Sequence, residues 1–247
     1  MKRRHTNSDD ADTYSDLLYS TPAGAGNNNC YSWAVEAYSN ARGGRKLQPG
    51  DLSGVGSLAA NGSGNTPSNG VDIGRCEDVL AKTERDAAAQ RHWVRRVDAS
   101  ASVACPRGSS KIMAFLDPGN DYHWYRFHRN LLYRVRHPRT VAELAAEFGV
   151  RPEDVHAPGT SSSSKTRLAK GDMVLIRGAA VWSHKRGHSP EGPLLKDACG
   201  KIIKDPRTAC RDYGTGTNYT TPCGALCYSK KTPTYTDLLK KKSNNNQ

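Results

Sequence analysis

The sequence lacks the hydrophobic segments that a membrane protein would need. No stretch is long enough to cross a bilayer, and the first ten residues contain no apolar core of the kind found in a signal peptide. Hydrophobic residues make up only 36% of the 247 residues and aromatic residues 7%, which predicts a modest core and long loops. A chain of this length can form one large domain or two small ones.

The sequence also lacks the Cys-x2-Cys pair that is typical of zinc sites. Cys223 and Cys227, and likewise His184 and His188, have spacings that a metal could use, but disulfides are favoured over zinc for these cysteines. The seven cysteines form an odd set. If Cys30 is the free thiol, an even set remains to pair, in an order that the sequence leaves open: Cys76, Cys105, Cys199, Cys210, Cys223 and Cys227.

Acidic residues are too few to balance the basic ones. The net charge is +12, which indicates an anionic partner, either a cell-wall polymer or an acidic protein surface in an assembly. Nucleic acid is a third and unspecific candidate, because no nucleic-acid-binding motif accompanies the charge. The alternative is a basic surface that is simply solvated.

The segment around Cys30 has the pattern of a helix start. Asn29 is a good N-cap, and the helix is expected to run from Cys30 to about Ala41 and to stop at Gly43. A thiol in the first turn is close to the positive end of the helix, which predicts a lowered thiol pKa. Backbone N–H groups near it, at Asn29 and Tyr31, could hold the oxyanion of an acyl intermediate.

The best base for this thiol is His123, in a strand predicted at residues 122–129. Alternation places His123 on one face with Tyr125 and Phe127. The plainer interpretation makes Cys30 a small core residue or half of a disulfide, and His123 a packed strand histidine.

Other elements follow from local patterns. Residues 21–29 and 53–74 are predicted as loops, 75–94 as a helix, and 111–116 and 180–185 as strands. Residues 186–229 are rich in Gly, Pro and Cys, so we expect them to be held by cross-links rather than by regular structure. We expect residues 1–13 to be a polar arm and residues 233–247 a polar tail.

Residues 131–177 have the pattern of a self-contained unit. A strand at 133–136 precedes a helix at 140–148, which is capped by Thr140 with Glu143 three residues on and stopped by Gly149. A short helix at 151–155 and a closing strand that ends at 176 complete it.

This unit resembles a LysM domain. The similarity comprises Tyr133-x-Val135 at its start, residues 141–150 in its middle and residues 168–176 at its end. It implies a βααβ module that binds N-acetylglucosamine-containing glycans such as peptidoglycan or chitin. Its ligand loops would place these residues on the glycan: Arg136, His137, Arg139, Thr140, Ala157, Pro158 and Gly159.

With that insertion removed, a second similarity appears. Residues 29–34, 48–52 and 121–126 resemble the cysteine, loop and histidine blocks of NlpC/P60- and CHAP-like peptidases. This implies an α+β, papain-like domain at 14–130 and 178–232, in which a helix packs on an antiparallel sheet. It also implies catalysis by Cys30 and His123, with His184 as the third polar residue, and no cofactor.

Two function classes remain open. The first is a cysteine amidase or endopeptidase that cuts peptide or amide bonds of cell-wall polymer. The second is a non-catalytic structural protein on the same scaffold, such as a minor capsid component, because a longer string of these blocks is also similar to proteins of bacteria and large DNA viruses. The localisation stays open between a non-classical export route and a virus particle.

Overall fold

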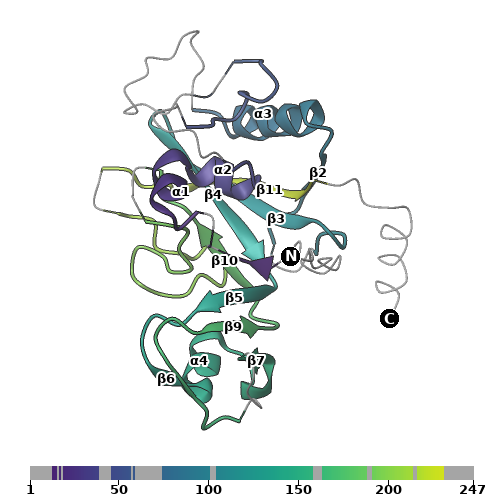
Figure 1. Ribbon diagram of the computed structural model, residues 1–247. Coiled ribbons are helices and arrows are strands. Elements are labelled where there is room, and N and C mark those ends of the chain that lie inside the picture. The colour runs from purple at the N-terminus through teal and green to yellow at the C-terminus, as the bar shows by residue number, and fades with distance from the viewer. Residues whose placement is uncertain are drawn as a thin grey trace.

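The computed structural model describes residues 13–15, 17, 19–38, 46–56, 58, 74–100, 104–157, 163–187, 191–213 and 216–230. It has an α+β fold, as predicted, with few helices and with mixed and antiparallel sheets (Figure 1). The central sheet is antiparallel and has the order β10 (Val181–His184), β4 (Asp121–His128), β3 (Ser110–Asp117), β11 (Thr221–Ser229) and β2 (Trp93–Val97).

Helices cover one face of this sheet (Figure 1). The short helix α2 (Cys30–Ala34) packs on β4 and β10, and α3 (Cys76–Ala89) packs on β11, β2 and β3. A further helix, α1 (Pro22–Asn27), starts with Thr21 as its N-cap in a segment predicted as loop. The helix predicted at residues 75–94 is longer than α3, because Trp93 and Val94 belong to strand β2.

The helix that starts at Cys30 is shorter than predicted, because tertiary contacts end it. Glu36 adopts a positive φ of 54°, and its carboxylate pairs with the Arg126 guanidinium at 2.7 Å. Arg126, which is buried, also donates to the carbonyl of Ala34 at 2.8 Å. A charged side chain on β4 thus binds the last carbonyl of α2.

Residues 130–177 form a second region, at the lower end of the view in Figure 1. A mixed sheet has the order β1 (Thr13–Tyr14), β5 (Asn130–Arg134), β9 (Met173–Ile176) and β7 (Val155–His156), and a small ladder joins β6 (Arg139–Thr140) to β8 (Arg167–Leu168). The predicted pairing of the two flanking strands is confirmed, with Tyr133 opposite Val174. Helix α4 (Val141–Phe148) has the predicted Thr140–Glu143 capping box, and Gly149 ends it at φ 65°. The predicted second helix is one 3-10 turn, η2 (Pro152–Asp154).

The second region shares its core with the segments that flank it. Leu131, Leu144 and Ile176 belong to one buried hydrophobic cluster with Tyr14 and Trp33. β1 pairs in parallel with β5, which binds the N-terminal segment to this region through backbone hydrogen bonds as well.

The prediction for residues 186–229 is wrong at its end. β11 is a nine-residue strand in the middle of the sheet, between β3 and β2. Its register shifts between Pro222 and Gly224, which marks a β-bulge, and these two residues hide the strand from a pattern search.

The six predicted partners do form disulfides, and Cys30 is the free cysteine. The pairs are Cys76–Cys223, Cys105–Cys227 and Cys199–Cys210. Cys223 and Cys227 therefore have no thiolate to offer a metal. Within the described ranges, no helix is both long and apolar enough to cross a membrane.

Candidate active site

Cys30 lies at the first position of helix α2, as predicted. The side chain of Asn29 accepts a hydrogen bond from the Ser32 N–H at 3.0 Å, and the Ser32 hydroxyl accepts one from the Asn29 N–H at 2.9 Å. The Asn29 amide also donates to the carbonyl of Leu47 at 2.7 Å. This capping box fixes the helix start and joins it to the loop at residues 46–53.

The Cys30 sulfur lies against the backbone of the strand that carries His123. It is 3.9 Å from the carbonyl oxygen of Tyr122, and the backbone N–H of Trp124 is hydrogen-bonded to it. Burial raises the pKa of the thiol to about 12, and Asp121 adds to the increase. The prediction of a lowered thiol pKa is therefore wrong for the folded chain. The loss of hydration on burial raises the pKa by more than the positive end of the helix lowers it.

His123 and His184 form a hydrogen-bonded pair beside this strand. The His184 Nε2 lies 3.1 Å from the carbonyl oxygen of Lys196, which can only accept, so this nitrogen carries the proton. The His184 Nδ1 then accepts from the His123 Nε2–H at 2.8 Å. This order leaves a lone pair on the Nδ1 of His123, the state that a general base needs.

Both imidazoles are neutral in the fold. Burial lowers the pKa of His184 to about 4. Burial also lowers the pKa of His123 well below its ordinary value, and the neighbouring His184 adds to that effect.

Aromatic rings enclose His123. Tyr219 stacks on it with ring centroids 4.9 Å apart, and Tyr125 meets it edge-on. The Tyr219 hydroxyl donates to the carboxylate of Asp121 at 2.7 Å, which fixes the stacked ring. His123 is accordingly only 3% exposed.

The thiol and the imidazole are not hydrogen-bonded to each other within the described part of the chain. Tyr122 and Trp124 pack into the hydrophobic cluster that contains Cys30, whereas Tyr125 packs on the other side of the sheet. Because neighbouring strand residues point to opposite faces, His123 lies on the Tyr125 side, as predicted. Strand β10 ends at His184, opposite Tyr125, so the edge of β4 next to His123 has no neighbouring strand among the residues that the structure describes. The Cys30 sulfur lies against this edge.

One of the two predicted oxyanion donors is engaged, because the Asn29 N–H belongs to the capping box. The Tyr31 N–H acts on the Cys30 sulfur itself and lowers the pKa of its thiol. The N–H of Cys30 itself is at the first helical position, where the helix supplies no acceptor, and is the better-placed donor.

Two lysines near the thiol were missed by the sequence interpretation. Lys185 is buried, and burial together with the charge of Lys46 lowers its pKa to about 8. The Lys185 Nζ donates to the carbonyl of Arg186 at 3.1 Å, and the Lys46 Nζ donates to that of Gly187. The positive charges of Lys185 and Lys46 would both favour an anion at Cys30. In the sequence, the only indication of this role is the position of Lys185 directly after His184.

No family of known proteins, no curated protein and no solved structure matches this chain.

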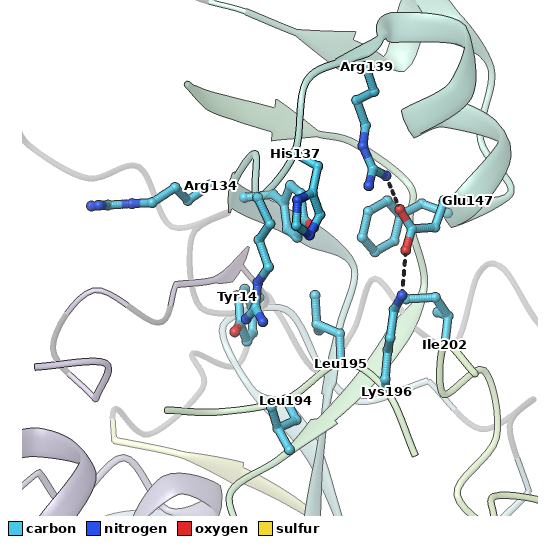
Figure 2. Close-up of a pocket in the computed structure, with 12 residues that line it drawn as sticks. Tyr14, Arg134, His137, Arg139, Glu147, Leu194, Leu195, Lys196 and Ile202 are labelled. Carbon is cyan, nitrogen blue, oxygen red and sulfur yellow. Dashed lines mark hydrogen bonds and ion pairs between the residues drawn. The ribbon is translucent and has the colours of Figure 1, made fainter. Parts of the chain in front are cut away.

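The described residues among the predicted glycan-binding set have different surroundings. Arg136, His137 and Arg139 line a pocket, whereas Thr140 caps helix α4 and Ala157 packs against the hydrophobic core (Figure 2). Pro158 and Gly159 lie outside the described residues.

Proposed function

We propose that the chain is a cysteine hydrolase that cuts peptide or amide bonds of a cell-wall polymer. The observation that carries this proposal is the ordered hydrogen-bond chain from the Lys196 carbonyl through His184 to His123, next to the free cysteine of the described chain. The fixed tautomer leaves the Nδ1 of His123 unprotonated and able to accept a proton, and the helix start offers the N–H of Cys30 as a donor.

In the proposed reaction, Cys30 sulfur attacks the amide carbon while His123 Nδ1 takes the thiol proton. The tetrahedral oxygen accepts from the Cys30 N–H, and His123 then gives its proton to the leaving amine. Water hydrolyses the thioester, releasing a carboxylate and restoring the thiol. Because the thiol and the imidazole share no hydrogen bond at rest, substrate binding has to bring them together, as happens in enzymes whose catalytic contacts tighten only in the complex.

The papain-like arrangement and the LysM-like module remain part of this proposal. Supporting them are a helix with the cysteine at its start, packed on the strand of the histidine, and the β5–α4–β9 succession. In this view the second region holds the glycan of the polymer, while the thiol acts on its peptide.

Release of amines from purified peptidoglycan by the full chain tests the proposal. Cys30→Ala and His123→Gln should each reduce the rate by at least about a hundredfold. His92→Gln is the matched control, because His92 lies between α3 and β2, outside both the proposed catalytic pair and the second region, and its replacement should leave the rate unchanged. Full activity in the Cys30→Ala protein would contradict the mechanism.

A second candidate is a structural protein of a virus particle built on the same scaffold. The burial of Cys30 at 5% exposure and its raised pKa favour it, as does the net charge of +12. It predicts no amine release by the wild-type chain, and binding to polyglutamate-coated beads that weakens steeply between 50 and 300 mM salt.

A further inference from the structure

A pocket of about 290 Å³ lies where the second region meets the loop at residues 194–202 (Figure 2). Its wall comes from the segment after β5 and from the end of α4 on one side, and from Leu195, Lys196 and Ile202 on the other. It includes three of the residues predicted to bind glycan, Arg136, His137 and Arg139, whereas neither Thr140 nor Ala157 lines it. Its size is at the lower end of the range for small-molecule sites.

The polar part of the wall is positively charged. Its one carboxylate, that of Glu147, forms ion pairs with the Lys196 Nζ at 3.0 Å and with the Arg139 guanidinium. Burial would raise the pKa of Glu147, but these two hydrogen bonds outweigh burial and lower it. Glu147 is therefore ionised and already satisfied, and it fixes the positions of two cations.

A further cation at the pocket has no partner. Arg136 is exposed and makes no ion pair or hydrogen bond with another described residue. Arg134 is equally exposed, but Figure 2 shows its side chain pointing away from His137 and Glu147. Arg136 thus offers a free guanidinium fork, the group that binds carboxylate and phosphate in two parallel hydrogen bonds.

The rest of the wall is apolar and partly aromatic. Tyr133 and Phe148 meet edge-on with centroids 5.2 Å apart, and Leu195 faces His137 in Figure 2. Together these side chains form a surface on which the face of a ring can lie.

We propose that this pocket binds a small ring-shaped organic anion, with its carboxylate or phosphate on Arg136 and its ring against Tyr133, Phe148 and Leu195. The pocket contains none of the residues proposed for the chemistry at Cys30. The backbone of Lys196 accepts from His184 while its side chain reaches Glu147, so the two sites share one residue.

Calorimetric titration of the full chain tests the proposal with four matched probes. Benzoate and phenyl phosphate carry both a ring and an acid, benzamide carries the ring alone, and acetate carries the charge alone. We expect at least one of the two acidic ring compounds to bind tenfold or more tightly than benzamide and acetate, and the stronger of the two identifies the acid.

Arg136→Gln should weaken that binding by about tenfold, because it removes a charge-assisted pair. Arg177→Gln removes the same charge from an exposed arginine of the second region that does not line the pocket, and it should leave the affinity within twofold. Thermal unfolding of both variants checks that they are folded. The proposal would be overturned if neither benzoate nor phenyl phosphate binds more tightly than both benzamide and acetate, or if the two arginine variants have an equal effect.

Discussion

At the scale of single residues, the candidate site is a set of titratable groups kept neutral by burial. Cys30 is protonated because its pKa is raised, and His123 and His184 are unprotonated because theirs are lowered. Transfer of a proton from Cys30 to His123 would create an ion pair in a poorly hydrated place, which a substrate or Lys185 would have to stabilise.

The raised thiol pKa predicts slow alkylation of Cys30 in the native protein. At pH 7 to 8 iodoacetamide should modify it orders of magnitude more slowly than an unfolded cysteine, and the rate should increase about tenfold per pH unit. Mass spectrometry after timed quenching measures the rate, with the non-reduced, urea-unfolded chain as the reference. Rapid modification at neutral pH would mean that the thiol is open and ionised at rest.

The lowered pKa of His184 predicts a loss of stability in acid. An unfolded histidine binds a proton near pH 6.5, whereas folded His184 does so only near 4, so the unfolded state binds more protons in between. Stability should be full above pH 6.5 and fall by roughly 3 kcal/mol as the pH is lowered to 4. Buried His123 and His128 act in the same direction.

Urea unfolding at pH 7 and at pH 4.5 measures this loss. In His184→Gln, which keeps a polar side chain but cannot be protonated, the difference between the two pH values should be smaller. An unchanged difference would show that His184 does not contribute.

Much of the residue-level site could be predicted from the sequence, and its burial could not. An odd number of cysteines indicated one free thiol, the helix-start pattern made Cys30 the candidate, and strand alternation placed His123 with Tyr125. The pKa of Cys30 depends instead on Tyr122, Trp124 and other residues distant in sequence, which no local pattern brings together.

At the scale of elements, the buried carboxylate of Asp86 joins the loop at residues 50–53 to helices α2 and α3. Asp86 of α3 accepts from the Tyr31 hydroxyl at 2.7 Å, the Gly50 N–H at 2.8 Å, and the Ser53 N–H and hydroxyl at 2.8 and 2.7 Å. Asp86 is only 2% exposed, so water cannot replace its carboxylate. Removing its charge would leave the four N–H and O–H donors around it with a weaker acceptor.

Asp86→Asn should therefore lower the free energy of unfolding by about 2 to 4 kcal/mol. Asp78→Asn is the matched control on the same helix, because the Asp78 side chain is 38% exposed and its contact to Arg75 is 4.0 Å long. It should change stability by less than about 0.5 kcal/mol. Equal effects in urea unfolding would argue against this role of Asp86.

Elements with local signals were predictable, and those shaped by distant contacts were not. Helix α4 has its cap, its apolar face and Gly149 within ten residues of sequence, and the prediction was correct. Strand β11 contains Pro222 and Gly224, which argue against a central strand unless a bulge is known to be there. Helix α2 ends at Ala34 because of Arg126, 92 positions away.

At the scale of the whole molecule, the region of the central sheet and the second region are joined by a shared hydrophobic cluster as well as by the chain itself. The cluster that contains Leu144 of α4 and Ile176 of β9 also contains Tyr14, Trp33 and Val181, from outside residues 131–177. The sequence predicted the second region as separable, since its strand–helix–strand pattern is complete in itself. The shared cluster argues for cooperative unfolding of both regions instead.

The positions of the tryptophans allow a direct test. All four, Trp33, Trp93, Trp124 and Trp182, lie outside residues 131–177, and only Trp33 belongs to the shared cluster, so tryptophan fluorescence reports mainly on the part of the chain outside the second region. Leu144 is fully buried within the second region. Leu144→Ala should lower the free energy of unfolding by about 2 to 4 kcal/mol, through lost burial and the cavity that it leaves. If the two regions unfold together, the tryptophan transition in urea must shift by this full amount, although no tryptophan lies in the changed region. If residues 131–177 unfold as a separate domain, the fluorescence transition should stay at its wild-type midpoint while far-ultraviolet circular dichroism shows an earlier loss of helix.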